Sequence, residues 1–511
     1  MKKLSELLEG LDFEVFSGDF DSHESDLEIT QVVYDTRKIC EGCLFICLKG
    51  ANFDSHEKAA WALENGAAAL IIERDLPELK GTKGIVLKCD DTRHALSLVS
   101  HSFFGHPERR MTTIGVTGTK GKTTTTYLIK SILEAAGHKV GLIGTIETIY
   151  GDKRIPSLNT TPESYILAEY FSRMVDEGVD TVVMEVSSQA LKMHRTDGIL
   201  FDYGIFTNIE PDHIGPNEHE SFEDYLYCKS LLFSHCKVGV VNGDDPHLKE
   251  ILKGHTCEVI EFGFGAEDYS ASNETLYREG SELGVSFHLS GKEEMDLTVA
   301  TPGRFSIYNA LAAGALALEM GVPKDALKSA LKSTHVRGRV EPVKVSDDFI
   351  LLIDYAHNAM ALQSLLQALR DYEPHRIVAV FGCGGNRSKL RRFEMGEVSG
   401  KYADFTIITS DNPRYEDPEA IMDDIEVGIK RTASDEKYIR ITDRKEAIRH
   451  AILNGEGGDI IVLAGKGHED YQEIEGVKHH MDERDLISEV LLEEGALDSE
   501  GNLRRNWLKD R

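Results

Sequence analysis

The sequence predicts an α/β protein of three domains, at residues 1–108, 109–336 and 337–511. Three observations predict this class. The length of 511 residues corresponds to about three domains of roughly 150 residues. Short apolar runs alternate with helical stretches, as in βαβ units. Two turn signals, Gly105-His106-Pro107 and Arg337-Gly338-Arg339, interrupt this alternation and indicate the boundaries.

The first domain is predicted to be a small α/β domain. Leu44–Leu48 and Ala68–Ile72 have the composition of buried strands, and Glu57–Asn65 has that of a helix that ends at Gly66.

The central domain is predicted to hold a mostly parallel sheet. A strand run at Thr113–Thr117 precedes a helix at Thr123–Ala136, and the strand runs that follow are Val140–Ile143, Thr181–Met184, Gly204–Thr207 and Val238–Val241. Leu283–Leu289 alternates polar and apolar residues, which indicates an antiparallel insertion, and Tyr308–Met320 is predicted to be a helix.

The last domain repeats the doubly wound, Rossmann-like pattern. Its strand runs are Phe349–Ile353, Ile377–Phe381, Phe405–Thr409 and Asp459–Ala464. The last dozen residues are polar, and we expect them to be frayed.

Charge and composition exclude several classes of protein. With 57 Lys+Arg and 87 Asp+Glu the net charge is −30, which argues against binding to nucleic acid or an anionic membrane surface. We find no apolar run of about 18 residues and no signal peptide, so we expect a cytoplasmic protein without membrane insertion. The eight cysteines are unevenly spaced, as in a reducing compartment. Cys40, Cys43 and Cys47 lack a second ligand cluster, so we interpret them as strand residues rather than a zinc site.

A glycine-rich segment, Gly115-Val-Thr-Gly118-Thr-Lys-Gly121-Lys122-Thr123-Thr124, lies between a predicted strand and a helix. In such a P-loop, backbone N–H groups and the helix N-terminus bind phosphate. Lys122 would reach the β/γ-phosphates of a nucleotide and Thr123 a Mg²⁺ ion. Val116 stands where the full motif has glycine, and a strand–helix turn without a ligand is the alternative.

Polar residues also follow neighbouring strands. Glu185 and His213 fall where parallel strands end, and such an edge binds ligands in α/β sheets. Each alone is more often a cap or a structural residue, but together with the P-loop they indicate a metal–nucleotide site.

Four strand ends of the last domain carry polar groups, in Asp354-Tyr-Ala-His357, Gly382–Arg387, Asp411-Asn412-Pro413-Arg414 and Gly465-Lys-Gly467-His468-Glu469. Turns favour these residue types, but they do not require the charges. We expect Arg387, Arg414 and Glu469 to converge on a ligand with amine and carboxylate groups.

From about Asp35 to Asp482, these motifs together resemble the Mur ligase family of ATP-dependent amide-bond-forming enzymes. The resemblance implies a first domain for a UDP group, a central domain for ATP and a last domain for an incoming amino acid. It implies ATP and Mg²⁺ as cofactors, and a UDP-N-acetylmuramoyl-dipeptide and a diamino acid as partners. We expect a monomer.

The resemblance assigns roles to individual residues. Asp35-Thr36-Arg37 matches a uridine-contacting Asp-Ser-Arg, and Thr36 keeps the hydroxyl. The residues that it implies for the muramoyl-dipeptide are Asn159, Thr160, Thr161, Ser187 and Arg195. Those implied for ATP are Gly118, Thr119, Lys120, Gly121, Lys122, Thr123, Thr124, Asn309, Arg339 and Asp354, where Lys120 replaces the usual Asn.

For magnesium the resemblance implies Thr123, Glu185, His213 and Lys229, and Lys229 matches a lysine that is carbamylated in the family. Lys122, Lys229 and His213 form the implied catalytic set. The chain departs from the family at Gln189, which is usually His, in the Glu210–Pro216 loop, and at Asn358, which is usually Pro.

The amino-acid site implied by the resemblance consists of Arg387, Asp411, Asn412, Arg414, Gly465 and Glu469. The Asp-Asn-Pro-Arg form is associated with meso-diaminopimelate. A guanidinium can pair with the second carboxylate of that amino acid, whereas it would repel the ammonium group of lysine. The expected activity is therefore addition of meso-diaminopimelate to the D-glutamate γ-carboxylate of UDP-N-acetylmuramoyl-L-alanyl-D-glutamate, through an acyl phosphate, in peptidoglycan synthesis.

Three alternatives remain open. The same ligation could use L-lysine or another amino acid. The chain could be a folylpolyglutamate-type synthetase, or a catalytically silent protein that binds nucleotide.

All these ligands are anionic although the chain is acidic. We therefore expect local cations inside clefts, namely Lys122, Arg195, Arg339, Arg387 and Arg414, with the acidic excess on the outer surface.

Overall fold

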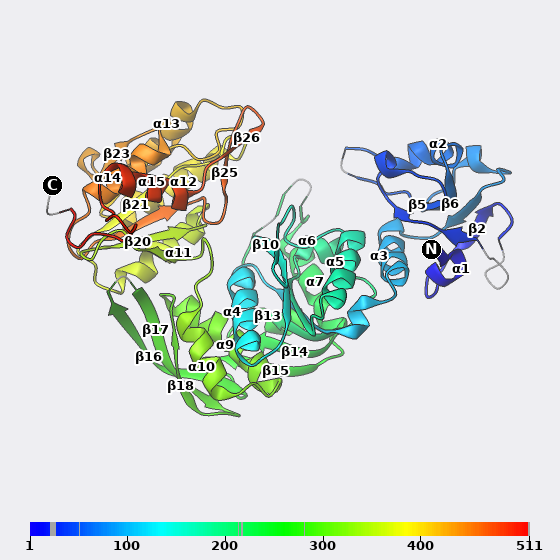
Figure 1. The fold of residues 1–511 in the computed structure, drawn as a ribbon, viewed down its shortest axis with the longest axis horizontal. Coiled ribbons are helices and arrows are strands. Elements are labelled where there is room, and N and C mark those ends of the chain that lie inside the picture. The colour runs from blue at the N-terminus through cyan, green and yellow to red at the C-terminus, as the bar shows by residue number, and fades with distance from the viewer. Residues whose placement is uncertain (21–26, 51, 213, 216–217, 281, 509–511) are drawn as a thin grey trace. The chain divides into compact units, whose positions relative to one another are not determined.

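The computed structural model describes residues 1–20, 27–50, 52–212, 214–215, 218–280 and 282–508. It divides into two compact units, Met1–Ser270 with Leu311–Leu327, and Ala271–Ala310 with Lys328–Arg511. Both units are layered α/β structures, so the predicted fold class is confirmed (Figure 1). The boundaries near residues 108 and 336 stay predictions. In the described part of the chain, no helix has the length and apolar character needed to cross a membrane.

The chain begins with a five-stranded sheet of strand order β2-β7-β6-β5-β4. Its apolar side chains pack on helices at both faces, with α1 and α3 on one face and α2 on the other. The bounds are β2 Glu14–Ser17, β4 Val32–Val33, β5 Cys43–Ile46, β6 Ala67–Ile72, β7 Ile85–Lys88, α1 Leu4–Leu7, α2 Ala59–Glu64 and α3 Thr92–Phe103, and a short pair joins β1 Lys2–Lys3 to β3 Glu28–Ile29.

The central sheet of the first unit is parallel in six neighbouring strands, with an antiparallel pair at one edge. The order is β11-β10-β9-β12-β8-β13-β14-β15. Strand β8 lies between β12 and β13, and Glu185 at the end of β12 is in register with Val116 of β8. The bounds are β8 Thr112–Thr117, β9 Val140–Ile143, β10 Glu147–Tyr150, β11 Lys153–Pro156, β12 Thr181–Glu185, β13 Phe201–Phe206, β14 Cys236–Asn242 and β15 Glu258–Gly263.

Helices of the first unit continue this alternation. Leu167, Phe171 and Met174 of α5 pack with the buried residues Val182 and Met184 of β12. The helices are α4 Lys122–Ala135, α5 Ser164–Asp176, α6 Ser188–Lys192, α7 Phe222–Ser230 and α8 Leu248–Ile251.

The predicted antiparallel insertion is confirmed. β17 (Glu282–Gly291) pairs antiparallel with β18 (Met295–Val299) and neighbours β16 (Tyr269–Glu279). The helices α9 (Arg304–Glu319) and α10 (Lys324–Ser333) follow.

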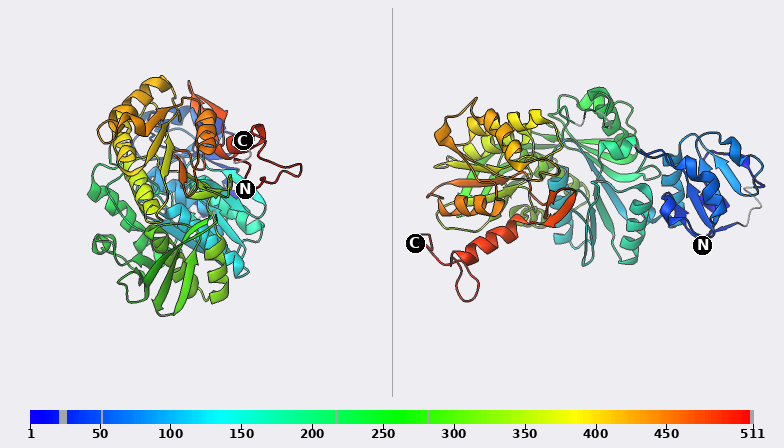
Figure 2. Two further views of the ribbon diagram at one scale, coloured as in Figure 1. Left: turned by 90° about the vertical axis from the view of Figure 1, so that its left-hand side faces the viewer. Right: turned by 90° about the horizontal axis from the view of Figure 1, so that it is seen from above.

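The C-terminal sheet has the order β19-β20-β24-β21-β22-β23 and is parallel apart from β19. Its buried residues form two apolar layers, one with α11, α12 and α13 and the other with α14 and α15. Helices surround this sheet in the ribbon views (Figures 1 and 2). The bounds are β19 Glu341–Val343, β20 Ile350–Asp354, β21 Ile377–Phe381, β22 Phe405–Ile408, β23 Tyr438–Arg440, β24 Ile460–Ala464, α11 Ala359–Arg370, α12 Lys389–Tyr402, α13 Pro418–Ile429, α14 Arg444–Leu453 and α15 Glu483–Glu493, with a hairpin of β25 Tyr471–Ile474 and β26 Val477–His480.

The expectation that the last dozen residues are frayed is wrong for the described ones. Trp507 is only 4% exposed and packs in the apolar layer of α14 and α15. Its indole N–H donates to the carbonyl of Val345 at 2.9 Å. A large aromatic side chain can hold a polar segment in place, because it buries much apolar area while its N–H group keeps a hydrogen-bond partner.

A buried ion pair joins the first residues of α14 and α15 in the C-terminal unit. Arg444 (3% exposed) and Glu483 (0%) are joined by a 2.7 Å contact between Nη2 and Oε1. Arg444 also donates to the carbonyls of Ser410 and Ala464 at 3.3 and 3.0 Å. These two residues directly precede Asp411 and Gly465, so Arg444 fixes the ends of two neighbouring chain segments that carry candidate site residues.

We expect Arg444→Met to destabilise this domain by about 3–5 kcal/mol, because it leaves the Glu483 carboxylate buried without its partner. The measurement is urea unfolding followed by the fluorescence of Trp507 in a Trp61→Phe background, since the chain has two tryptophans. The control is Arg431→Met, which removes an exposed pair with Glu397 and should cost less than about 1 kcal/mol. Equal midpoints for the two variants would contradict the role of the buried pair.

Candidate functional site

The P-loop of the first unit has the backbone that phosphate binding needs. Gly121 has a left-handed backbone (φ 85°) directly before α4, and Gly118 has φ 150°. A Cβ atom at Gly118 would lie 1.9 Å from Oγ1 of Thr207, so no other residue fits there without rearrangement. The backbone N–H of Lys120 donates to the Asn208 side chain at 2.9 Å. The loop is therefore held by residues that follow the neighbouring strand β13.

Two lysines converge on one carbonyl oxygen of this loop. Nζ of Lys122 and Nζ of Lys229 each donate to the carbonyl of Gly118 at 2.8 Å. Lys229 is 1% exposed and lies over the ring of Tyr225 at 4.5 Å. Burial, and next the charge of Lys122, hold the pKa of Lys229 well below its usual value. The setting of Lys229 thus differs from that of a surface lysine, because burial and a neighbouring ammonium group both oppose its charge.

The hydroxyl of Thr123 and the carboxylate of Glu185 meet beside the P-loop. Oγ1 of Thr123 donates to Oε1 of Glu185 at 3.0 Å, and Glu185 is 1% exposed. Thr145 supports the carboxylate through its N–H at 2.8 Å and its hydroxyl at 3.0 Å. The oxygen-rich pair fits the preference of Mg²⁺ for oxygen ligands. The fourth predicted magnesium residue, His213, lies outside the described residues.

Three of the residues predicted to bind the dipeptide form one hydrogen-bonded group next to Glu185. Oγ1 of Thr161 donates to the carbonyl of Glu185 at 2.8 Å and accepts from the N–H of Ser187 at 3.1 Å. Nη1 of Arg195 donates to the carbonyl of Thr161 at 3.0 Å. Thr160 is connected through its hydroxyl to Thr145 at 3.1 Å.

The two other residues predicted to bind substrate in the first unit, Thr36 and Asn159, each follow a strand. Thr36 begins the short helical turn Thr36–Lys38 after β4, which Asp35 caps through the N–H of Arg37. Asn159 is exposed in the loop after β11.

In the second unit, Asp354 directly precedes Tyr355 in the sequence, and Arg339 contacts the Tyr355 ring. The carboxylate of Asp354 accepts from the N–H groups of Val340 and Ala356, both at 2.8 Å. The guanidinium of Arg339 stacks on the Tyr355 ring at 4.6 Å, and His468 lies 4.8 Å from the same ring. Burial, followed by the charge of Arg339, lowers the pKa of His468 to about 3, so this imidazole is neutral. Asn309 is buried on α9.

The predicted amino-acid residues meet at the ends of β22 and β24, around a buried lysine. Nζ of Lys466 donates to Asn412 at 3.0 Å and to Glu469 at 2.9 Å, and it lies 3.8 Å from Asp411. Asn412 in turn donates to Glu469 at 3.0 Å. Lys466 is 0% exposed, so its charge is matched within the group. A Cβ atom at Gly465 would lie 2.9 Å from the Asp411 carboxylate, which explains the glycine.

Arg414 is held at the rim of this group in an uncommon backbone conformation (φ 54°). Its Nη1 donates to the carbonyl of Gly385 at 2.7 Å and its Nε to Glu473 at 3.2 Å. The N–H of Arg414 also donates to the carbonyl of Glu473 at 2.9 Å. Arg387 is exposed, and both arginines lie near Gly384, where a Cβ atom would be 2.8 Å from Arg414 Nη1 and 3.8 Å from Arg387 Cγ.

The five predicted cations differ in how far they are exposed to solvent. Lys122, Arg195, Arg339 and Arg414 are half-buried among candidate site residues, as expected. Arg387 is exposed, and the expectation that all five lie inside clefts is wrong for it.

Sequence reasoning missed several residues of these groups. Lys466 lies inside the quoted Gly465–Glu469 motif, and the signal was a lysine directly after a predicted buried strand. Thr145 follows Gly144 after the strand Val140–Ile143, a weaker signal of the same kind. Glu473 has no signal in the sequence, because only the hairpin of β25 and β26 brings it to Arg414.

The fold and the glycine loop are those of a P-loop α/β protein with a Rossmann-like C-terminal sheet. Three family profiles match the chain, described as the Mur ligase family catalytic domain at residues 28–104, the Mur ligase middle domain at 116–317 and the Mur ligase glutamate ligase domain at 338–467. The chain belongs to the Mur ligase family.

Curated relatives match over nearly the whole chain. The UDP-N-acetylmuramoyl-L-alanyl-D-glutamate--2,6-diaminopimelate ligase of Caldanaerobacter subterraneus subsp. tengcongensis is 42% identical over 96% of this chain and 99% of its own length. The protein of the same name from Bacillus velezensis is 39% identical over 96% and 99%.

Solved structures share the fold. A structure of a UDP-N-acetylmuramoyl-L-alanyl-D-glutamate--2,6-diaminopimelate ligase superposes with a TM-score of 0.68 at 28% identity and covers 93% of this chain and 97% of its own. The MurF ligase of Thermotoga maritima in complex with ADP has a TM-score of 0.58 at 19% identity, with coverage of 86% and 95%. The folylpolyglutamate synthase of Mycobacterium tuberculosis, complexed with ADP and AMPPCP, has a TM-score of 0.58 at 18% identity and covers 73% of this chain and 92% of its own. The last two likenesses concern the fold alone.

Proposed function

We propose that this chain is an ATP-dependent ligase that adds meso-diaminopimelate to UDP-N-acetylmuramoyl-L-alanyl-D-glutamate in peptidoglycan synthesis. The observation that carries the proposal is the amino-acid group of Asp411, Asn412, Glu469 and Lys466, with Arg414 at its rim. It offers carboxylates for an amine and a guanidinium for a carboxylate. The curated relatives named for this reaction support the same substrate pair.

The P-loop would bind the phosphates of ATP. Its glycines leave room for phosphate oxygens, and the first turn of α4 presents backbone N–H groups. Lys122 would turn from the Gly118 carbonyl to the phosphates. Thr123, Glu185, His213 and Lys229 would hold Mg²⁺, which supplies positive charge against the phosphates during transfer.

In the reaction, the γ-carboxylate of the D-glutamate attacks the γ-phosphorus of ATP, which gives an acyl phosphate and ADP. The amine of diaminopimelate then attacks the acyl carbon, an N–C bond forms, and phosphate leaves with the electrons of the C–O bond. Lys122 stabilises charge on the transferring phosphoryl group. Thr161, Ser187 and Arg195 would position the dipeptide, Thr36 the uridine, and Asp354, Asn309 and Arg339 the nucleotide.

Lys229 would act as a carbamate. Carbon dioxide reacts with a neutral amine, and the pKa of Lys229 is held well below its usual value by burial and by Lys122. The carbamate would place anionic oxygen atoms beside the P-loop, and Mg²⁺ prefers ligands of this kind. The intact mass of the protein, measured without acid, would carry the additional carbon dioxide.

The test is ligation with the purified UDP-muramoyl-dipeptide and a parallel panel of meso-diaminopimelate, L-lysine and L-ornithine, measured by mass spectrometry and ADP release. We expect meso-diaminopimelate to be preferred by about 100-fold or more in kcat/KM. Lysine and ornithine lack the second carboxylate, so they would leave the Arg414 guanidinium without a partner. A clear preference for lysine would reject the assignment of Arg414.

Two other outcomes separate the remaining alternatives. ADP release that requires a folate and glutamate would indicate a folylpolyglutamate-type synthetase, and nucleotide binding without any amide product would indicate a silent binding protein. We place the reaction in the cytoplasm and propose a monomer, which sedimentation of the active protein would test.

A further inference from the structure

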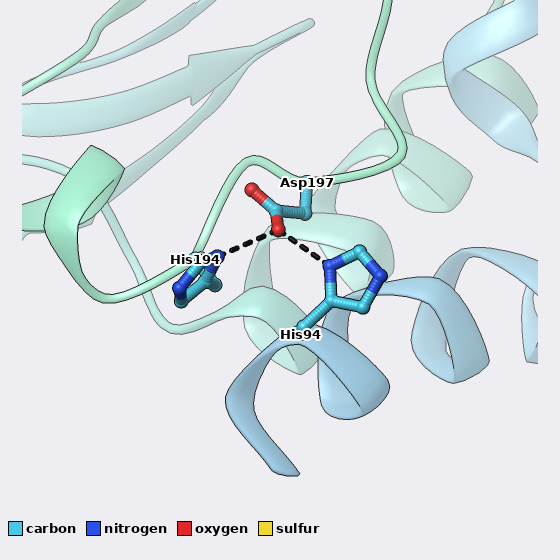
Figure 3. A group of neighbouring side chains, drawn as sticks. All are labelled: His94, His194 and Asp197. Atoms are coloured by element: carbon cyan, nitrogen blue, oxygen red, sulfur yellow. Dashed lines mark hydrogen bonds and ion pairs between the residues drawn. The ribbon is translucent and has the colours of Figure 1, made fainter. Parts of the chain in front are cut away.

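Two imidazole rings and one carboxylate meet in a group that includes the residue before Arg195 (Figure 3). His94 is in the first turn of α3, while His194 and Asp197 lie in the loop between α6 and β13. Oδ2 of Asp197 is 2.6 Å from Nδ1 of His94 and 2.8 Å from Nδ1 of His194. The three side chains are half-buried and reachable from solvent. We call them the His94 cluster.

Hydrogen bonds hold the helix and the loop that carry the His94 cluster. Asp91 caps α3 by accepting from the N–H groups of Arg93 and His94. Ser97, one turn further on the same helix, donates to the carbonyl of Asp197 at 2.8 Å. Glycine at position 198 lets the loop approach the helix, since a Cβ atom there would lie 2.9 Å from Leu98. The ligand atoms are therefore positioned by the fold and do not depend on long flexible side chains.

We propose that His94, His194 and Asp197 form a binding site for a divalent transition-metal ion of the zinc class. Two imidazole nitrogens and a carboxylate oxygen are typical zinc ligands, and water would complete a four-coordinate site. Ligand atoms around tetrahedral zinc lie about 3.3 Å apart. The Asp197 oxygen, now 2.6 and 2.8 Å from the two imidazole nitrogens, would therefore withdraw by about half an ångström or slightly more, and all the ligand atoms already lie within 4.8 Å of one another. No ligation step depends on this ion.

An outer carboxylate supports the same assignment. A histidine that binds a metal through one ring nitrogen commonly points the other at a carboxylate. Here Oδ2 of Asp91 lies 3.7 Å from Nε2 of His194, while Nδ1 of His194 faces Asp197. At 3.7 Å the Asp91 carboxylate is near this outer position and interacts with His194 by charge, without a hydrogen bond.

The ligand atoms of this site differ in kind from those of the proposed magnesium site. Mg²⁺ prefers oxygen ligands, as at Thr123 and Glu185, whereas imidazole suits Zn²⁺, Co²⁺ or Ni²⁺. The ion would connect α3 to the loop that contains Arg195, the residue after His194. It would therefore hold a proposed dipeptide-binding residue against the helix that follows the predicted UDP-binding sheet.

Protons compete with the ion for this site. The hydrogen bond to Asp197 raises the pKa of both His94 and His194, and Asp91 acts in the same direction. Burial opposes this rise at both rings, as do the charge of His194 at His94 and the charge of Arg93 at His194. Metal binding needs neutral imidazoles. Affinity for the ion should therefore be high above the raised pKa values and fall as the pH is lowered through them.

The experiment is a titration of the full chain, without a polyhistidine tag and freed of metal by a chelator, with Co²⁺ in excess Mg²⁺. The visible absorption of bound Co²⁺ and its displacement by one equivalent of Zn²⁺ are measured. We expect one saturable site in the wild type, and at least about tenfold weaker binding in His94→Ala and Asp197→Asn.

The matched control is His138→Ala, because His138 forms a surface pair with Asp180 at 3.1 Å without the second imidazole of the His94 cluster. It should bind Co²⁺ as the wild type does. Zn²⁺ should also raise the Tm of the wild type and of His138→Ala but not that of His94→Ala, which detects a variant that has merely unfolded. Equal affinity in His94→Ala and wild type, or no saturable binding in the wild type, would overturn the proposal.

Discussion

Lys122→Ala is expected to lower kcat for ligation by about a thousandfold, because it removes the ammonium group that stabilises charge on the transferring phosphoryl group. The side chain is half-buried and donates to the loop carbonyls of Gly118 and Thr119 at 2.8 and 3.1 Å. The fold should therefore tolerate its loss. ADP release with saturating dipeptide and diaminopimelate is the measurement, with circular dichroism as a check on folding.

The control for this prediction lies two turns further along the same helix. Lys130 is half-buried and pairs with Glu134 one turn further along α4, so Lys130→Ala changes the charge of the helix equally without touching the loop. It should keep kcat within about twofold, since it removes no group of the P-loop. Normal ligation by Lys122→Ala would refute the proposed mechanism.

Replacement of Arg414 by asparagine is expected to lower kcat/KM for meso-diaminopimelate by about 100-fold or more, because the second carboxylate loses its charged partner. The substitution tests the side chain alone. Arg414 has a left-handed backbone (φ 54°), which asparagine adopts more readily than most residues. Stability in urea should consequently be unchanged or slightly higher, and the KM for ATP should stay the same.

Two further variants test whether the effect is specific to the guanidinium group of Arg414. Arg414→Lys keeps the charge but not the bidentate geometry, so we expect an intermediate loss. Arg370→Asn removes an exposed pair with Asp404 on the same domain and should leave kcat/KM unchanged. If Arg414→Asn still preferred diaminopimelate over lysine by the ratio of the wild type, another residue would have to read the second carboxylate.

The sequence predicted most of the fold because apolar runs and turn residues act locally. Ile377–Phe381 and Val140–Ile143 have the predicted bounds, since these strands are buried and end at polar residues. The predicted helix Glu57–Asn65 instead begins as the 3₁₀ turn Ser55–Lys58, capped by Asp54. The error at Trp507 has another origin, because its burial depends on Val345, which is distant in sequence.

The candidate site was predictable to the extent that strand ends identify it. The end of β12 places Glu185 beside the P-loop, as the order of the strands requires. The role of Thr145 and the pairing of Glu473 with Arg414 depend on side-chain directions and on a hairpin, which local patterns do not encode. The burial of Lys229 was equally hidden, since its helix spacing is that of a surface lysine.

The separation between Lys466 and Arg414 has a consequence for how the family can diversify. Lys466 and the Arg444–Glu483 pair order the backbone and the polar groups that we propose face the reacting amine, which every amino-acid substrate has. Arg414 instead rests on Glu473 and Gly385 at the rim. Mutations at the rim can therefore accumulate without a loss of folding or of the shared chemistry. Selection for a new cell-wall amino acid would then act on a few peripheral positions, while the buried lysine and its partners remain under constant constraint.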